Sequence, residues 1–382
     1  MTSRERMDRA MRPADGGPPE RCPVMCQLAL GHYFLNTEIP AVDIWQDSAS
    51  FAETLVMFQR RYQFDGILVN LPGRDPEWRD AIASIEIRGG KTFVKWHEGF
   101  MTIIPSDDNA RVVTAEGRCP EPPSLAAIDP QNLFYIEPHD RLGVIPMNRF
   151  PPWQCATLRA VRNLAPDVSV HGEIFSPFSQ LVELLGVSEA MLALVDDPAK
   201  IKACLQRLVE GSATLGSELL RAGADAVLIS SAYAGSGFIS RRHYAEFVLP
   251  FERATIERIK AAVPRAIVYT HTCGSIGDRL DLMEQTGTDG IDTLDPPPLG
   301  NVDLADARRQ LSSRTFIKGN IDPVNTVLRG TADDCYNAAL DRIAAAGSKG
   351  YIVSTACSVP PRAPAENIMA ISRAAKESAC AV

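Results

Sequence analysis

The chain has 382 residues, of which 45% are hydrophobic and 23% charged, a composition typical of globular proteins. Its net charge of −8 argues against general nucleic-acid binding, because phosphate recognition requires a basic surface. No apolar run approaches the roughly 20 residues that a membrane-spanning helix needs, and residues 1–20 lack the apolar segment of a secretion signal. Nine scattered cysteines do not suggest a disulfide framework. We therefore expect a cytoplasmic protein that binds neither nucleic acid nor membranes, and homo-oligomerisation stays open.

The N-terminal third of the chain predicts a lead-in, a first strand and an antiparallel insertion. Residues 1–20 end in a cluster of glycine and proline, so we interpret them as an extension that precedes a single domain at 21–382. The apolar run at 64–70 predicts a buried strand. From about 82 to 118 the pattern changes to alternation around Gly89-Gly90, which predicts a small β-hairpin insertion.

From residue 168 onward, predicted strands and helices alternate regularly. Apolar runs rich in β-branched residues predict strands, and amphipathic segments with helical periodicity separate them. Repeated strand–helix units are typical of a parallel α/β fold, so we predict a (β/α)8 TIM barrel. Strands are predicted at 168–173, 223–230, 266–271, 290–293, 315–319 and 350–354, and helices at 199–221 and from Ser240 to about 262 with a kink at Pro250.

Two short stretches that follow predicted strands carry metal-binding residue types. His271 and Cys273 lie two apart, so in an extended chain their side chains point to the same face. Cys357 follows the strand at 350–354 and could supply a third ligand, because barrel sites gather at the C-terminal ends of the strands. One imidazole and two thiolates suit zinc, and three protein ligands leave the open position of a catalytic site. The alternative is that the cysteines are small core residues.

A short motif late in the chain carries a family resemblance. Residues 318–323 read Lys-Gly-Asn-Ile-Asp-Pro, and further landmarks occur at 21–24, 175–178 and 357–367. These motifs resemble those of the uroporphyrinogen decarboxylase superfamily, whose signature is Gln-Gly-Asn-hydrophobic-Asp-Pro. The resemblance covers nearly the whole chain and agrees with the predicted barrel.

Within that superfamily, the resemblance favours the cobalamin (corrinoid)-dependent methyltransferase branch. True decarboxylases carry an Arg-Gln-Ala-Gly-Arg segment for the carboxylates of a tetrapyrrole, whereas residues 27–32 contain no arginine. His271, Cys273 and Cys357 resemble the zinc ligands of the methyltransferases. The resemblance implies transfer of a methyl group between a small substrate (a thiol, a methoxylated aromatic or similar) and cobalamin on a separate corrinoid protein. No Asp-x-His-x-x-Gly cobalamin motif occurs in this chain.

Other polar and aromatic residues at predicted strand ends complete the expected site. We expect Glu173 and Asp292 to act in catalysis, Glu173 as a fourth ligand or a proton acceptor. The glycine-rich loop at 232–237 is a candidate mobile lid or docking element, and Asp322 is expected to fix its own loop. The expected substrate-binding residues are Asn70, Tyr233, Asn320 and Phe175.

Two other functions remain open from the sequence. A cofactor-free decarboxylase would fit the family signature but not the missing arginines. A non-catalytic barrel subunit would fit the fold but would give the three metal-binding residues no purpose. The methyl donor and acceptor, and the direction of transfer, are not identified.

Overall fold

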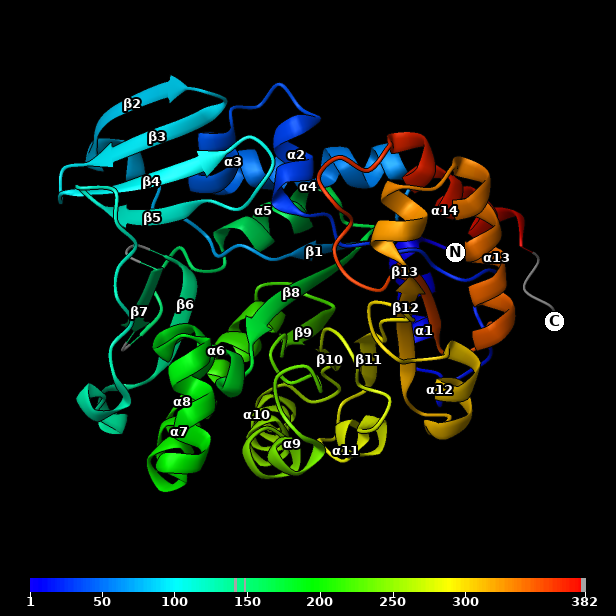
Figure 1. Cartoon of the computed structure of the whole chain (residues 1–382). Coiled ribbons are helices and arrows are strands. Elements are labelled where there is room, and N and C mark those ends of the chain that lie inside the picture. Colours follow the sequence, from blue (N-terminus) through cyan, green and yellow to red (C-terminus); the bar gives the residue numbers. More distant parts are fainter. Residues whose placement is uncertain (141–142, 148, 379–382) are drawn as a thin grey trace.

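The computed structural model describes residues 1–140, 143–147 and 149–378. Its centre is a curled parallel sheet (Figure 1). The sheet has seven strands, and their order in space follows the chain: β1 (Gly66–Val69), β8 (Ser169–Phe175), β9 (Ala226–Ser230), β10 (Val268–His271), β11 (Gly290–Thr293), β12 (Phe316–Ile321) and β13 (Tyr351–Thr355). The predicted parallel α/β architecture is therefore confirmed.

A closed barrel of eight strands was predicted, but the described residues contribute seven strands to this sheet. The segment around Val24 lies at both of its edges. The Met25 N–H donates to the carbonyl of Val353 (3.0 Å), and the Asp65 N–H donates to the carbonyl of Val24 (2.7 Å). This segment forms isolated bridges rather than a strand. Pro23 has no N–H to donate, which works against a regular ladder here.

Helices connect the strands and pack mainly against the outer face of the sheet (Figure 1). Helix α4 (Ser48–Tyr62) precedes β1. The helices between and after the strands are α5 (Ala156–Leu164), α6 (Pro177–Leu185), α7 (Val187–Asp196), α8 (Pro198–Arg221), α9 (Arg241–Phe247), α10 (Leu249–Ala262), α11 (Leu280–Glu284), α12 (Leu304–Gln310), α13 (Ala332–Ala346) and α14 (Ala365–Glu377). Among the described residues, no single helix is long and apolar enough to cross a membrane, although the bent pair α6 and α7 passes that test on length and composition.

The helix predicted from Ser240 to about 262 is two helices in the structure. Ser240 caps α9 as expected, because its hydroxyl accepts a hydrogen bond from the His243 N–H at 3.1 Å. The chain then breaks at Val248, and Pro250 lies in the first turn of α10. A proline lacks the N–H that a continuous helix would need at this point, so it begins a new helix instead of bending one.

Alternation along the strands sends every second side chain to the inner face of the sheet. At the N-terminal ends of the strands these side chains are apolar and include Leu228, Tyr269 and Phe316. Met7 and Met11 of helix α1 (Ser3–Met11) pack into the same buried cluster. Helix α1 therefore fills this end of the interior. Thr2 and Glu5 form a capping box at its start.

The inner face becomes polar toward the C-terminal ends of the same strands. His271 follows Tyr269 by two positions, and Lys318 follows Phe316 by two, so both point inward. Asp292 on β11 has the equivalent orientation and contacts both of them. The sequence thus places a layer of titratable residues above an apolar base, and His271 and Asp292, both expected at the site, belong to that layer.

Smaller antiparallel elements lie beside the parallel sheet (Figure 1). The region where alternation predicted a hairpin forms a sheet of four strands, β2 (Ile82–Arg88), β3 (Lys91–Trp96), β4 (Phe100–Pro105) and β5 (Arg111–Thr114). Gly89 and Gly90 make the first turn with φ of 57° and 70°, as a tight two-residue hairpin turn requires. Strands β6 (Tyr135–Asp140) and β7 (Gly143–Met147) form a second hairpin, and helices α2 (Leu30–Leu35) and α3 (Ala41–Gln46) precede α4.

Candidate metal centre

Three side chains with metal-binding atoms meet at the C-terminal end of the sheet. His271 ends β10, Cys273 follows it by two residues, and Cys357 follows β13. Their ligand atoms all lie within 4.8 Å of one another, and no other such group of three occurs among the described residues. Strands β10 and β13 are not neighbours in the sheet, so the curl of the sheet brings these residues together.

The spacing of these atoms suits a tetrahedral ion. His271 Nε2 lies 3.2 Å from Cys273 Sγ, and Cys273 Sγ lies 3.9 Å from Cys357 Sγ. In a tetrahedral zinc site with Zn–S bonds of about 2.3 Å, two sulfurs stand about 3.8 Å apart. One nitrogen and two sulfurs are also the donor types that zinc prefers. The donor set therefore fits zinc, with one coordination position left for another group.

His271 is oriented by the residues on its other side. Its Nδ1 lies 2.9 Å from the hydroxyl of Thr293 and 3.3 Å from a carboxylate oxygen of Asp292. These contacts leave Nε2 directed at Cys273. In metal sites, the ligating histidine usually donates its second N–H to a carboxylate or similar group, which fixes the ring and its tautomer.

Lys318 completes this buried chain of contacts. Its ammonium lies 2.9 and 3.0 Å from the two carboxylate oxygens of Asp292, and the two side chains are 3% and 2% exposed. Burial opposes the ionisation of Asp292, but Lys318 and His271 together outweigh this effect and lower the pKa of the carboxyl. Asp292, expected to act in catalysis, thus contacts both His271 and Lys318.

The three candidate ligands shift one another's pKa values. Contact with the Cys273 thiol lowers the pKa of Cys357 well below its usual range, and the same contact raises the pKa of Cys273. Burial disfavours the imidazolium of His271, but Cys273 and Asp292 outweigh it and raise the pKa of His271. Cys357 is therefore readily ionised, and the thiolate is the form of cysteine that binds metals.

Asp295 is a buried carboxyl near this centre that the sequence did not single out. Its Oδ2 accepts a hydrogen bond from the Gly274 N–H at 2.6 Å, next to Cys273. Burial raises the pKa of Asp295 to about 6. Gly274 adopts φ of 78°, a conformation that favours glycine. Asp295 thus supports the turn that carries Cys273 and has a pKa in the range useful for proton transfer.

The glycine-rich loop at 232–237, a candidate mobile lid or docking element, is held against the centre by its backbone. The Ser236 N–H donates to the carbonyl of Ser275 at 2.9 Å. A Cβ atom on Gly235 would lie 2.3 Å from the carbonyl oxygen of Cys273, so only glycine fits this approach. Tyr233 in the same loop donates its hydroxyl hydrogen to Glu183 at 2.5 Å. The loop is therefore a packed wall beside Cys273.

The remaining expected residues lie at the polar end of the inner face but not in the metal cluster. Glu173, Asn70 and Phe175 line one small cavity at the ends of β1 and β8. Asn320 is fully buried, and its amide donates to the carbonyl of Leu294 at 2.8 Å. The structure thus places these side chains around the mouth of the sheet and does not place Glu173 among the three clustered ligands.

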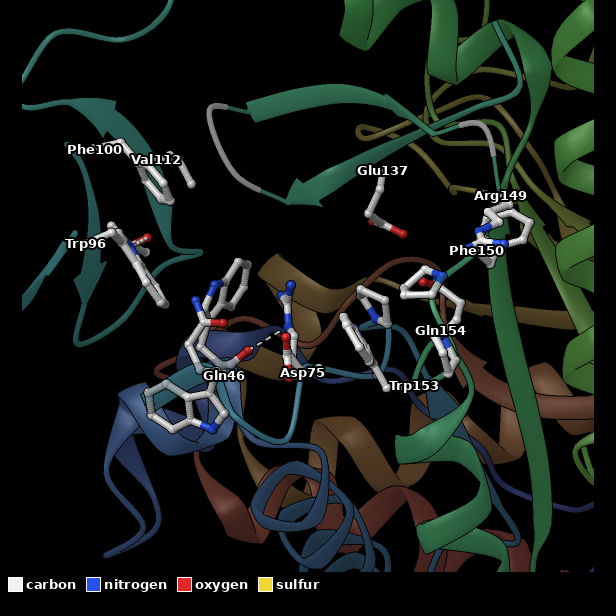
Figure 2. Close-up of a pocket in the computed structure, with 18 residues that line it drawn as sticks. Gln46, Asp75, Trp96, Phe100, Val112, Glu137, Arg149, Phe150, Trp153 and Gln154 are labelled. Carbon is white, nitrogen blue, oxygen red and sulfur yellow. Dashed lines mark hydrogen bonds between the residues drawn. The ribbon is translucent and has the colours of Figure 1, made fainter. Parts of the chain in front are cut away.

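A much larger cavity lies next to that small one. Its volume is about 590 Å³, and it lies between the insertion strands and the loops that follow β1 and precede α5 (Figure 2). All four tryptophans of the chain line it: Trp45, Trp78, Trp96 and Trp153. Sequence reasoning missed this cavity because these residues come from four separate segments with no common spacing.

Comparison with known proteins assigns the family. The family model described as uroporphyrinogen decarboxylase (URO-D) matches residues 101–378. The chain belongs to the uroporphyrinogen decarboxylase family. The superfamily expected from the short motifs is therefore confirmed, and with it an enzyme family.

The curated relatives of this URO-D family member are named uroporphyrinogen decarboxylase. The relative from Trichodesmium erythraeum (strain IMS101) is 30% identical over 180 residues, and the one from Nostoc punctiforme is 30% identical over 181 residues. Each match covers 47% of this chain and 48% of the relative. The chain thus spans about half the length of these relatives. The relative from Crocosphaera subtropica is 24% identical over 70% of this chain and 72% of its own length.

Solved structures show that the fold is shared more widely. A methyltransferase from Methanosarcina mazei has a TM-score of 0.71 at 16% identity and covers 99% of both chains. A B12-independent methionine synthase from Shewanella sp. W3-18-1 has a TM-score of 0.55 at 11% identity, over 93% of this chain and 97% of that one. At these identities the likeness concerns the fold alone.

Proposed function

We propose that this URO-D family member is a zinc-dependent methyltransferase that moves a methyl group between a small substrate and cobalamin carried by a separate corrinoid protein. The observation that carries the proposal is the cluster of His271, Cys273 and Cys357, whose donor types and spacing fit a three-ligand zinc site. The methyltransferase from Methanosarcina mazei shares the fold, which makes the proposal compatible with the architecture.

Zinc bound here would act as a Lewis acid, either lowering the pKa of a substrate thiol so that it loses its proton to a base or to water, or polarising the oxygen of a methoxy group. The protein itself would supply position and charge. Asp292 and Thr293 would hold the His271 ring with Nε2 toward the ion. Lys318 would balance the negative charge of Asp292 in the buried interior. Cys273 and Cys357 would bind as thiolates.

The proposal gives the other polar residues supporting roles. Asp295 lies beside the Cys273 turn and, with a pKa raised to about 6 by burial, could exchange a proton with a substrate near neutral pH. Glu173 would face the substrate from β8, and Asn70 and Phe175 would shape the same region. The wall at 232–237 would limit access to Cys273 from one side.

A second candidate is a cofactor-free decarboxylase, which the names of the curated relatives favour. Residues 27–32 lack the arginines expected for binding the carboxylates of a tetrapyrrole, which speaks against it. Metal content separates the two proposals, because decarboxylation without a cofactor gives the His–Cys–Cys cluster no role.

The test is the metal content of the purified full chain, measured by mass spectrometry of the elements. We expect about one zinc per chain, as a three-ligand catalytic site would bind. A Cys273→Ser, Cys357→Ser double variant should lose this zinc, whereas Cys119→Ser should retain it, because Cys119 is an exposed free thiol outside the cluster. Absence of zinc from the parent chain, even after zinc is supplied, would refute the proposal.

Activity is then tested with free cobalamin in place of the corrinoid protein. Thiols are offered with methylcobalamin, which gives up its methyl group, and methoxylated aromatics are offered with reduced cob(I)alamin, which accepts one. The cobalamin absorption spectrum reports methyl transfer in both directions. The double cysteine variant serves as the inactive control. Release of carbon dioxide from uroporphyrinogen by a chain without zinc would instead support the decarboxylase.

A further inference from the structure

The large cavity beside the parallel sheet has rigid aromatic walls. Trp45 packs under the guanidinium of Arg74 at 5.4 Å, and Trp78 packs under Arg79 at 4.4 Å. Trp96 stacks on Phe100, with ring centres 5.6 Å apart and an interplanar angle of 21°. The indole N–H of Trp96 also donates to the Thr102 hydroxyl at 2.9 Å. These contacts fix the rings before any ligand enters, which lowers the entropic cost of binding.

Two loops that line the cavity are locked together. A Cβ atom on Gly73 would lie 1.8 Å from the carbonyl oxygen of Trp153, and the Gly73 N–H donates to the carbonyl of Gln154 at 2.8 Å. This close approach holds Trp153 at the cavity and leaves no room for a larger residue at 73. The cavity is therefore a formed feature of the fold rather than a gap between loosely packed loops.

Charged groups are placed unequally around the cavity. Figure 2 shows Trp96 and Phe100 on one side and Arg149 on the opposite side. Arg149 is exposed, whereas the carboxylate residue Glu137 is only 5% exposed. A second guanidinium, that of Arg74, is held by its Nε–H donating to the Trp45 carbonyl at 3.0 Å. Asp75, the other acidic residue in the lining, is half-buried like Arg74, so the exposed Arg149 is the most accessible charged residue of this cavity.

The cavity lies at the functional end of the sheet. Gly73 and its neighbours follow β1, so they lie at the same end of the parallel strands as His271 and Cys357. Pro72, Glu137 and Gln154 line both this cavity and the small one that contains Glu173. The metal cluster itself does not line the large cavity, so binding there does not require a metal.

We propose that this cavity binds a planar aromatic carboxylate, with its rings against the tryptophans and its carboxylate on Arg149. A volume of about 590 Å³ lies within the range of small-molecule sites. Indole faces favour flat aromatic rings, and a guanidinium matches a carboxylate through two parallel hydrogen bonds. The inference names a substrate class for the proposed methyltransferase. Only methyl transfer to or from the bound ligand rests on the proposed function; binding of the ligand does not.

The test is calorimetric titration of the full chain with three probes of equal ring size: naphthalene-2-carboxylate, naphthalene-2-carboxamide and a trimethylammonium-substituted naphthalene. We expect the carboxylate to bind about 10- to 100-fold more tightly than the amide, as a charge-assisted hydrogen-bond pair allows. Arg149→Gln should remove this preference, and Arg118→Gln, at another exposed arginine outside the cavity, should not.

Further variants locate the site and separate it from the metal centre. Trp153→Ala, at a half-buried ring in a loop, should weaken all three probes, while the thermal unfolding of the variant checks its fold. Cys273→Ser should leave carboxylate binding unchanged even if it abolishes methyl transfer. No binding of the carboxylate at millimolar concentration, equal binding of the amide, tighter binding of the ammonium probe, or loss of binding in Cys273→Ser would each overturn the inference.

Discussion

The buried pair of Asp292 and Lys318 offers a sharp test of how the metal centre is held. Removing one member of a buried ion pair leaves the other charge without compensation, which costs about 3–5 kcal/mol of folding free energy. Both Asp292→Asn and Lys318→Met should destabilise the protein by about this amount, because both side chains are almost fully buried. The double variant should recover much of the loss, since no isolated charge remains.

Zinc affinity should respond differently from stability. Asp292 contacts His271 directly, and loss of such an orienting carboxylate weakens metal binding by about 10- to 100-fold. The double variant, although restabilised, should therefore remain weak in zinc binding. Urea unfolding measures the change in stability, and competition with a chromogenic chelator measures the change in zinc affinity. Asp281→Asn, in the exposed pair with Arg241, is the matched control and should change unfolding by at most about 1 kcal/mol. A double variant that binds zinc as tightly as the parent would refute the orienting role of Asp292.

Three further predictions concern stability and the aromatic cavity. Burial raises the pKa of Glu252 from 4.5 to about 7, so the folded state loses stability relative to the unfolded state as pH rises from 4.5 to 7. In urea unfolding, Glu252→Gln should therefore stabilise the protein by about 3 kcal/mol at pH 8 and by little at pH 4.5. An equal gain at both pH values would contradict the raised pKa of Glu252. Gly73→Ala should force the two cavity loops apart, cost about 1–3 kcal/mol and weaken binding of naphthalene-2-carboxylate; unchanged calorimetric affinity would argue against a preformed cavity. Met7→Ala should destabilise by about 2–5 kcal/mol by emptying the base of the interior without altering zinc content, and a cost below about 1 kcal/mol would mean that the surrounding side chains collapse into the space.

The parallel strands were predictable because buried strands are continuous apolar runs between breakers. The strand predicted at 290–293 matches β11, and the others differ from the structure by a few residues at their ends. Predicting an eighth strand failed for a local reason, because the segment that lies at the edges of the sheet is short and contains Pro23. Strand pairing also depends on which edges meet in space, and no local pattern encodes that.

The metal cluster was predictable in part. The spacing of His271 and Cys273 indicated a shared direction in an extended chain, and a third cysteine after another strand of the same sheet completed the set. The orienting chain was missed, although a signal existed. Lys318 is the one charged residue in the strand Phe316–Ile321, and the alternation of side chains along that strand points it inward. A buried ammonium requires a partner such as Asp292.

The aromatic cavity was not predictable from the sequence. Its tryptophans lie on α3, on the short turn after the loop that follows β1, on β3 and in the loop before α5. Their meeting depends on the tertiary packing of the insertion against the sheet. Phe175, which was expected to bind the substrate, does not line it.

The N-terminal helix that fills the base of the interior also sets the order in which the protein can be completed during synthesis. Helix α1 contacts β13, and the Met25 N–H bonds to Val353, so the first segments made require one of the last strands as a partner. At ribosomal rates of about 5–20 residues per second, this partner emerges roughly 20–70 seconds later. During that interval Met7 and Met11 have no complete site to fill. The face of α1 that carries Met7 and Met11 therefore stays uncovered until β13 has been made, so this end of the interior cannot close by local folding alone.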